Sequence, residues 1–234
     1  MSPEHKLTIL IPTLNAAVSL GLLLGDLARE LPSCPIVLAD GGSSDATQAL
    51  ARTQDGVTMI TTMPGRGRQL LAGAATLTEG WLLVLHADSR LAAGFGAFIH
   101  DHMNMVADQV GVARLRFDTN DWRASLIAAG ANWRTKWLGL PYGDQGLLIS
   151  MPTYQAIGGF TDVPLMEDVL LIRALKQAGF RIRLLPTTIT TSAARYQRDG
   201  YLARVWLNLS CLFDFWRGVP PDQLVLRYER RGPD

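Results

Sequence analysis

The sequence predicts an α/β fold in which a mainly parallel sheet is flanked by helices. Two observations support this prediction. Short apolar runs rich in β-branched residues alternate along the chain with longer segments of helical periodicity, which is typical of consecutive β-α-β units. Polar residues that could carry chemistry follow directly after several of these apolar runs, at the place where parallel sheets gather their ligand-binding loops.

The first half of the chain is the more regular half. Its apolar runs predict strands at Leu7–Ile11, Ile36–Ala39, Val57–Thr61 and Trp81–His86. Apolar residues at helical spacing predict helices between them, at Ala16–Glu30, Asp45–Thr53 and Gly67–Thr78. Ser44 or Asp45 is suited to cap the second of these helices.

The second half predicts further strands at Val110–Phe117, Gly146–Ser150 and Arg181–Leu185. Helices are expected at Gly94–Val106, Ser125–Trp137 and Glu167–Ala178, and Gly179 fits the C-terminal cap of the last one. Since no repeat, low-complexity segment or linker interrupts the chain, residues 1–234 are expected to form one domain.

Composition and charge narrow the possible functions. The 234-residue chain is 48% apolar and 18% charged, which is typical of a globular protein with a sizeable core. A net charge of +1 argues against a general nucleic-acid-binding protein. The first apolar run is too short for a signal peptide or a membrane span. Cys34 and Cys211 are expected to be free thiols in the reducing cytoplasm.

The segment Tyr201–Gly218 differs from the rest because it combines several aromatic residues with few charges. One interpretation is a helix packed on the body of the protein. The other is an apolar face that lies on a membrane or beside a lipid acceptor, with arginines as a cationic rim. The rim would be formed by Arg195, Arg198, Arg204 and Arg217. A spanning helix is not expected, because Arg204, Asn208 and Asp214 interrupt the apolar run.

Loops with residues suited to a nucleotide follow the first two predicted strands. Pro12–Asn15 follows the first strand. Asp40 ends the second strand and is placed to contact a ligand, and Gly41 beside it lets a ligand approach the backbone closely.

The third predicted helix opens with Gly65–Gln69. Arg66 and Arg68 offer forked donors to a diphosphate at the positive end of the helix dipole. The alternative is a turn with two solvated arginines. The segment is not a Walker loop, because no Gly-Lys-Ser/Thr sequence follows.

The apolar run Leu82–Leu85 is followed by His86, Asp88 and Arg90. Alternation along an extended chain would place these three side chains on one side of the strand end. That arrangement is either an ordinary solvated turn or a site for a metal and a phosphate. Because Asp40, both arginines of the third helix and Asp88 fall at the ends of consecutive strands, one crevice is expected to gather them.

The order of these elements resembles the nucleotide-sugar half of family 2 glycosyltransferases, which have the GT-A fold. In that family the first strand ends in a Pro-x-x-Asn turn, as Pro12–Asn15 does, and the second ends in an acidic DDGSxD loop, which Asp40–Asp45 matches. The fourth strand ends in a D-x-D motif that holds a divalent metal on the donor diphosphate. The resemblance implies a nucleotide-sugar half over about 1–90, an acceptor half over about 91–198 and a helical segment over about 199–234.

The chain departs from the family pattern at two positions. Gly41 stands where the family often has a second aspartate, so contact with the nucleoside rests on Asp40. His86 stands at the first acidic position of the metal motif, which leaves Asp88 as the oxygen ligand for Mg²⁺ or Mn²⁺. His86 could assist as an imidazole ligand or as a donor to ribose, or it could be structural.

Glu167 and Asp168 open a predicted helix, where acidic residues interact favourably with the dipole. In the family a Glu-Asp pair after a Gly-Gly-Phe stretch supplies the base, and Gly158–Phe160 precedes the pair here. The resemblance therefore implies that Asp168 takes the proton of the acceptor hydroxyl and that Glu167 adjusts its position or pKa. Asp144 and Gln145 are expected to hydrogen-bond sugar hydroxyls or to orient the donor.

Together the motifs predict an inverting glycosyltransferase that moves a sugar from a nucleoside-diphosphate sugar to a hydroxyl acceptor, which the aromatic C-terminal segment suggests could be a lipid. They resemble a bacterial subgroup of the family whose genes accompany radical-SAM and selenoprotein-related genes. The expected location is the cytoplasm, with peripheral contact at the inner face of the membrane. Two alternatives stay open: a non-catalytic nucleotide-sugar-binding protein, given Gly41 and His86, and a nucleotidyltransferase, which a glycine-rich loop with lysine after the first strand would favour.

Overall fold

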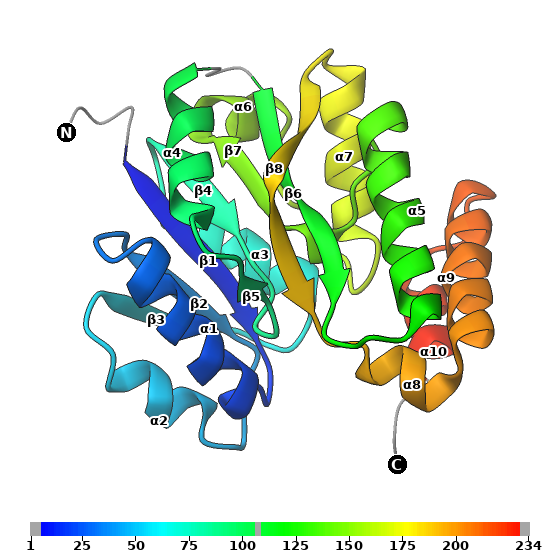
Figure 1. Cartoon of the computed structure of the whole chain (residues 1–234), viewed down its shortest axis with the longest axis horizontal. Coiled ribbons are helices and arrows are strands. Elements are labelled where there is room, and N and C mark those ends of the chain that lie inside the picture. The colour runs from blue at the N-terminus through cyan, green and yellow to red at the C-terminus, as the bar shows by residue number, and fades with distance from the viewer. Residues whose placement is uncertain (1–5, 106–108, 230–234) are drawn as a thin grey trace.

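The structure is a computed structural model that describes residues 6–105 and 109–229. At its centre the described residues form an eight-stranded sheet with the order β3-β2-β1-β4-β7-β6-β8-β5 (Figure 1). The strands are β1 (Leu7–Thr13), β2 (Ile36–Asp40), β3 (Val57–Thr61), β4 (Trp81–Val84), β5 (Arg90–Leu91), β6 (Gln109–Phe117), β7 (Leu147–Ser150) and β8 (Arg181–Thr191). The α-helices are α1 (Ala17–Glu30), α2 (Thr47–Arg52), α3 (Arg66–Ala74), α4 (Phe95–Met105), α5 (Trp122–Leu138), α6 (Met151–Ala156), α7 (Glu167–Gln177), α8 (Ala194–Asp199), α9 (Tyr201–Trp216) and α10 (Pro221–Glu229).

The order of the strands creates a switch point beside β1. This strand lies between β2 and β4 and pairs in parallel with both. The chain therefore continues from β1 to one side and later crosses to the other, which opens a crevice at the carboxyl ends of these strands. The predicted mainly parallel sheet is confirmed, although β7 runs antiparallel between β4 and β6 and so joins the two halves.

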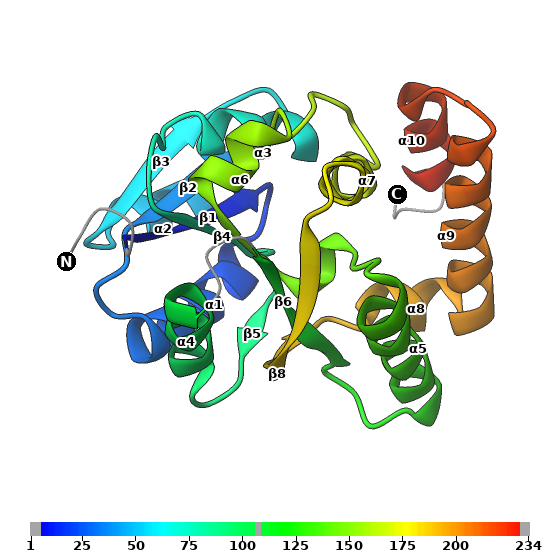
Figure 2. The same ribbon diagram turned by 90° about the horizontal axis from the view of Figure 1, so that it is seen from above.

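Helices cover both faces of the sheet (Figure 2). One face carries α1, α2 and α4, where Leu20, Leu27 and Phe95 belong to the core. The other face carries α3, α6 and α7, where Leu70 and Leu175 are buried. The sheet is therefore apolar on both faces, and the polar residues that remain for function lie at its edge.

One end of the molecule carries α5, α8, α9 and α10 (Figures 1 and 2). The α9–α10 pair packs on the residues that precede α7, because Leu207, Cys211 and Leu224 form one apolar cluster with Met166. The predicted helix in Tyr201–Gly218 is therefore confirmed as α9, packed on the body. No helix in the described part of the chain has the length and the apolar character needed to cross a membrane.

Most predicted elements are confirmed with shifted ends. The strand predicted to reach His86 ends at Val84, and the strand predicted at Arg181–Leu185 continues through Pro186 to Thr191. The helix predicted to end at Val106 ends, within the described residues, at Met105 as α4. The short elements β5, α6 and α8 were not predicted, whereas α10 lies within the helical segment expected over about 199–234. Both cysteines are free, as expected.

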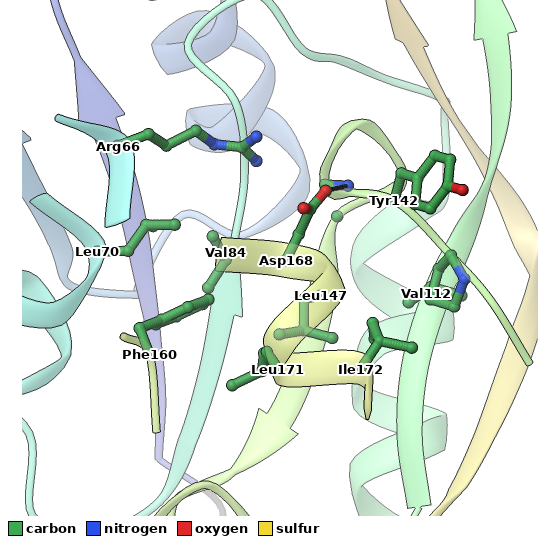
Figure 3. Close-up of a pocket in the computed structure, with 13 residues that line it drawn as sticks. Arg66, Leu70, Val84, Val112, Tyr142, Leu147, Phe160, Asp168, Leu171 and Ile172 are labelled. Carbon is green, nitrogen blue, oxygen red and sulfur yellow. Dashed lines mark hydrogen bonds between the residues drawn. The ribbon is translucent and has the colours of Figure 1, made fainter. Parts of the chain in front are cut away.

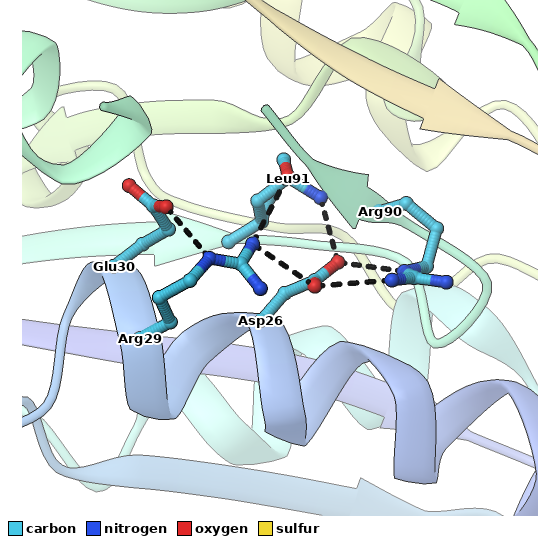
Figure 4. Close-up of polar contacts among 5 residues, drawn as sticks. All are labelled: Asp26, Arg29, Glu30, Arg90 and Leu91. Carbon is cyan, nitrogen blue, oxygen red and sulfur yellow. Dashed lines mark hydrogen bonds and ion pairs between the residues drawn. The ribbon is translucent and has the colours of Figure 1, made fainter. Parts of the chain in front are cut away.

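A buried carboxylate fixes the chain after the fourth strand (Figure 4). Asp26 of α1 is 2% exposed, and it accepts hydrogen bonds from Arg90 Nε at 2.6 Å, from Arg29 Nη2 at 3.1 Å and from the backbone nitrogen of Leu91 at 3.0 Å. Arg90 therefore points to α1 and not to His86 and Asp88, so the predicted grouping of these three on one side is wrong. The reason is that the chain turns at residues 86–89, where Ser89 N donates to the carbonyl oxygen of His86.

Asp26→Asn is expected to lower the free energy of unfolding by about 2–3 kcal/mol at neutral pH, because charge-assisted hydrogen bonds to a buried group are lost. Burial raises the pKa of Asp26, but the bonds from Arg90, Leu91 and Arg29 outweigh it, so the pKa lies below the ordinary 3.8. This stabilisation is present above pH 3.8 and is lost as the pH falls through the folded-state pKa. Urea unfolding at several pH values should show a smaller acid-induced loss in Asp26→Asn than in the wild type; an equal loss would contradict the assignment.

Candidate active site

The corner where β1 and β2 end is organised around Asp40. Its carboxylate is fully buried and accepts hydrogen bonds from Thr13 Oγ1 at 3.0 Å, Ser43 Oγ at 2.6 Å and Gln48 Nε2 at 2.9 Å. The backbone nitrogens of Gly42 and Ser43 donate to it as well, at 3.1 and 2.9 Å. Burial raises the pKa of Asp40, but these bonds outweigh it and the net pKa is lowered. The carboxylate was expected to contact the nucleoside. Its oxygens instead accept hydrogen bonds from the surrounding loop, so Asp40 stabilises the conformation of this corner.

Asn15 joins the loop after β1 to the loop after β2. Its side-chain oxygen accepts from the backbone nitrogen of Ser44 at 2.9 Å, and its own backbone nitrogen donates to Ser43 Oγ at 2.8 Å. Asn15 adopts a φ of 49°, which asparagine tolerates better than most residues. Pro12 lies within β1, opposite Ala39 of β2. Asn15 therefore holds the corner together, while Pro12 belongs to the strand that leads to it.

Gln69 of α3 takes the space beside Gly41. A Cβ atom on Gly41 would lie 3.2 Å from the side-chain amide of Gln69. The Gln69 amide nitrogen donates to the carbonyl oxygens of Thr13 and Ala39, both at 2.7 Å, so this buried side chain ties α3 to the ends of β1 and β2. Sequence reasoning missed Gln69, although its place right after the two arginines of α3 was a signal.

His86 and Asp88 lie together in the turn after β4. Their side chains approach to 3.9 Å between Nδ1 and Oδ1. Burial, together with the positive charges of Arg66 and Arg195, holds the pKa of His86 well below its usual 6.5, so the imidazole is neutral at pH 7. Its Nε2 is buried and has no hydrogen-bond partner among the described residues. The carboxylate of Asp88 accepts a hydrogen bond from Thr191 Oγ1 at 3.1 Å.

These properties fit a divalent cation. A neutral imidazole with an unused nitrogen and a carboxylate with an unused oxygen are both ligands for Mn²⁺, and the carboxylate alone suits Mg²⁺. No group of three histidine, cysteine or acidic side chains in residues 6–105 and 109–229 could hold an ion by itself. Donor phosphates and water would therefore complete the shell, as is common for Mg²⁺ in proteins that bind nucleotides.

The two arginines of α3 have separate partners. Arg66 Nη1 lies 3.0 Å from Glu167 Oε1 at the start of α7, and the Arg66 side chain is 30% exposed. Arg68 instead pairs with Asp162, and both of these side chains are exposed. The sequence predicted that both arginines bind phosphate, but only Arg66 lies beside the other site residues. Arg195, which was assigned to a membrane rim, lies close enough to His86 to affect its pKa.

Asp168 and Asp144 bring two more carboxylates to the same place. Asp168 accepts from the backbone nitrogens of Gly143 and Val169, both at 2.8 Å. Burial and the nearby charge of Asp168 raise the pKa of Asp144 to about 6. Gln145 does not face the cleft: it is fully buried, and it accepts from Thr135 Oγ1 at 2.7 Å and donates to the carbonyl oxygen of Ala113 at 3.1 Å.

Glu167 is almost fully buried beside Arg66. Burial raises the pKa of Glu167 and the negative charge of Asp168 adds to this, while the positive charge of Arg66 opposes it. The Arg66 guanidinium also packs directly against Gly143, so that a larger residue at this position would displace the end of the Arg66 side chain. The Arg66–Glu167 pair and the Gly143–Asp168 hydrogen bond therefore lock α3, α7 and the loop before β7 together.

A small cavity of about 30 Å³ lies beneath this group (Figure 3). Figure 3 shows the charged ends of Arg66 and Asp168 on one side of it and apolar side chains on the other, among them Leu70, Phe160 and Leu171. Its size is enough for one or two water molecules. Burial in these apolar surroundings lowers the local dielectric, which is the main reason why the pKa values of Asp144 and Glu167 are raised.

Asp144→Asn is expected to stabilise the protein near pH 8 by about 1–3 kcal/mol. The pKa of Asp144 is raised from the ordinary 3.8 to about 6 in the folded state. Between these two pH values the folded protein therefore keeps a proton on Asp144 that the unfolded chain has released. Stability therefore falls as the pH rises through this window, and the variant escapes that loss. Urea unfolding near pH 8 and pH 4 should show the gain only at the higher pH. Asp101→Asn, an exposed change in α4, is the control; an equal gain at both pH values would contradict the raised pKa.

The fold is that of GT-A glycosyltransferases. One similar solved structure is the mannosyltransferase PcManGT from Pyrobaculum calidifontis in complex with GDP-Man and Mn²⁺ (TM-score 0.64, 16% identity, 89% of this chain and 62% of that one). Another is GalNAc-T7 with UDP, GalNAc and Mn²⁺ (TM-score 0.63, 12% identity, 82% and 44%). A third is S. aureus TarS 1-349 (TM-score 0.58, 14% identity, 86% and 65%). The chain thus spans less than two thirds of the length of each of these proteins.

Residues 8–142, more than half of the chain, match the family model of Glycosyl transferase family 2. The chain therefore belongs to glycosyltransferase family 2. The matched segment includes the Asp40 corner, the His86–Asp88 turn and α3. No curated protein matches the sequence.

Proposed function

We propose that this protein is an inverting glycosyltransferase that moves a sugar from a nucleoside-diphosphate sugar to a hydroxyl acceptor, with the help of Mg²⁺ or Mn²⁺. The observation that carries the proposal is the position of Arg66. Its guanidinium pairs with Glu167 next to Asp168, and its charge also lowers the pKa of His86. The residues suited to a donor diphosphate and those suited to a base therefore face one space.

The donor side would use the residues at the ends of β1, β2 and β4. The corner held by Asp40, Asn15 and Gln69 would receive the nucleoside. His86 and Asp88 would hold the metal, which neutralises charge on the departing diphosphate. Arg66 and Arg195 would add positive charge at the same place, where it stabilises the transition state more than the ground state.

The acceptor side would use the start of α7. In a single displacement the acceptor oxygen attacks the anomeric carbon as the bond from that carbon to the diphosphate oxygen breaks, which inverts the configuration. The proton of the acceptor hydroxyl passes to Asp168. Glu167, held by Arg66, would position Asp168, and Asp144 would bind a sugar hydroxyl.

Three finer assignments belong to the same proposal. The acceptor would be lipid-linked and met at the inner face of the membrane, because α9 exposes apolar side chains and its buried face packs on Met166, the residue before Glu167. The protein would act in the cytoplasm, where Cys34 and Cys211 stay free. The motifs at His86–Ser89, Pro141–Gly146 and Pro164–Val169 would place it in the bacterial subgroup that accompanies radical-SAM and selenoprotein-related genes. Arg204 would not be part of a membrane rim, since it is buried and paired with Asp199.

Calorimetric titration with UDP, GDP and dTDP sugars, with and without Mn²⁺, tests the proposal. We expect one nucleotide class to bind in a metal-dependent manner, and Asp88→Ala to weaken this binding by at least about tenfold, which corresponds to 1.4 kcal/mol. Asp55→Ala, a change at an exposed carboxylate, is the control. If folded wild-type protein binds none of these donors, the proposed function is wrong.

A second candidate is a non-catalytic nucleotide-sugar-binding protein. It is favoured by Gly41 and His86, which stand where the family often has carboxylates. The same titration separates the two candidates when it is followed by an assay for release of nucleoside diphosphate. Binding that needs no metal and is followed by neither transfer nor hydrolysis would support the second candidate.

A further inference from the structure

Helix α5 buries small side chains and exposes large apolar ones, which is the reverse of the usual arrangement. Toward the protein it buries small residues, Ala124, Ala128, Ala131 and Thr135. Toward solvent it exposes large ones: Trp122 (72%), Leu126 (65%), Trp133 (59%) and Trp137 (66%). Successive members are four, seven and four residues apart, which places them along one stripe of the helix. On a helix that faced only water these side chains would add no stability, because a large apolar side chain is stabilising only when its surface is removed from water.

Helix α9 carries a second exposed stripe. It consists of Leu202 (87%), Trp206 (72%), Leu209 (54%), Phe213 (60%) and Trp216 (58%). The spacing alternates between four and three residues, so the five lie on one face. The opposite face is the one packed on the protein, through residues such as Leu207 and Cys211. The packing of α9 on the body therefore leaves this apolar stripe uncovered.

The two helices lie at the same end of the molecule (Figures 1 and 2). They are joined at their first turns, where the Arg123 guanidinium lies 4.6 Å from the centre of the Tyr201 ring. Ala124 and Ala128 belong to the same apolar cluster as Tyr201. Side chains that hold the two helices together thus come from their buried faces, and both stripes remain free.

The charges beside the stripes are positive. The sequence of α5 contains no acidic residue, and the acidic residue of α9, Asp214, is paired with Arg227. Cations lie next to exposed aromatic rings at three places: Lys136 at 5.2 Å from Trp137, Arg217 at 5.6 Å from Phe213, and Arg173 at 5.8 Å from Trp216. Exposed tryptophans with flanking cations are typical of surfaces that enter the headgroup region of a bilayer.

We propose that the exposed stripes of α5 and α9 together form a docking surface for an anionic lipid bilayer. The membrane contact expected from sequence was limited to Tyr201–Gly218, so α5 is a new and independent part of it. A second copy of the chain fits less well, because Asp121 and Asp214, the carboxylates beside the stripes, are already paired with Arg123 and Arg227, so two such faces would bring cations against cations. A bilayer containing anionic lipids supplies both an apolar layer and negative headgroups. Only the idea that this bilayer carries the acceptor rests on the proposed function.

Co-sedimentation of the full chain with vesicles tests this proposal. Vesicles of phosphatidylcholine are compared with vesicles that also contain phosphatidylglycerol. We expect binding to the anionic vesicles that weakens with salt. The double variants Trp133→Gln/Trp137→Gln in α5 and Trp206→Gln/Phe213→Gln in α9 should each reduce it by about tenfold. The control is Val18→Gln/Leu22→Gln, which changes exposed apolar residues of α1 and should bind like the wild type.

Two further measurements make the outcome decisive. Circular dichroism shows that each variant is folded, and light scattering gives the oligomeric state. Wild-type protein that does not bind anionic vesicles, or folded α5 variants that bind as well as the wild type, would overturn the proposal. So would a dimer that the α5 variants convert to a monomer, because the stripe would then be an interface between copies. Donor binding by calorimetry, which the docking variants should retain, keeps this test separate from that of the proposed function.

Discussion

Asp168→Asn is expected to lower the rate of sugar transfer by about 10²–10⁴-fold while donor binding stays unchanged. The amide has nearly the shape of the carboxylate and can still accept a hydrogen bond from the backbone nitrogen of Gly143, which lies 2.8 Å from the carboxylate now. It cannot take a proton from the acceptor. The loss should therefore appear in the turnover number and not in the donor dissociation constant.

The rate can be measured before the acceptor is known, as release of nucleoside diphosphate from the donor into water, since water needs the same base. Asp162→Asn is a matched control, because Asp162 is an exposed carboxylate paired with Arg68. A rate for Asp168→Asn within about threefold of the wild type would assign the base elsewhere. Asp144→Asn would then be the next variant to assay, since Asp144 is the neighbouring carboxylate.

Arg66→Met is expected to cost about 3 kcal/mol of unfolding free energy at neutral pH, because Glu167 would be left buried without its partner. This is the lower end of the range for buried ion pairs, since Arg66 keeps 30% of its side chain exposed while Glu167 keeps 2%. Without Arg66, the pKa of Glu167 would rise further above its ordinary 4.5. The cost should therefore grow as the pH rises above 4.5 and shrink below it.

The double variant Arg66→Met/Glu167→Gln should recover most of this loss, since it removes the charge as well as its partner. Urea unfolding of the wild type, both single variants and the double variant gives the coupling energy directly. Arg68→Met serves as the control and should change stability by less than about 1 kcal/mol, because its pair with Asp162 is exposed. If Arg66→Met is as stable as Arg68→Met, the buried pair does not hold α3 to α7.

The location of the site could be predicted from the sequence, because the ends of apolar runs mark the carboxyl edge of a parallel sheet. Asp40, Asp88 and Asp168 all lie at this edge or on the loops that face it. Their partners could not be predicted in the same way. In the sequence, a carboxylate that binds a ligand looks the same as a carboxylate that holds a loop. Burial in the structure distinguishes Asp40 from Asp88, and it likewise excludes Gln145 from ligand contact.

The helix predicted at Ser125–Trp137 is confirmed as α5, but the sequence could not show which of its faces is buried. In α5 the alanines are buried and the tryptophans are exposed, so apolar residues occur on both faces and give no amphipathic signal. Strand β8 was predicted too short because Pro186 interrupts its pattern. The structure accommodates this proline where the register between β6 and β8 shifts, between Leu184 and Thr188, which is a position that tolerates proline in a strand.

The turn that carries His86 and Asp88 is anchored on both sides. Before it, Leu85 N donates to the carbonyl oxygen of Leu10 at 3.0 Å; after it, Leu91 N donates to Asp26. The turn therefore has little conformational freedom left to lose when a ligand arrives. Folding has already met the entropic cost of ordering this turn, so an ion and its diphosphate would find the two side chains preorganised. Substitutions at Asp26 on α1 would therefore weaken binding by loosening the turn.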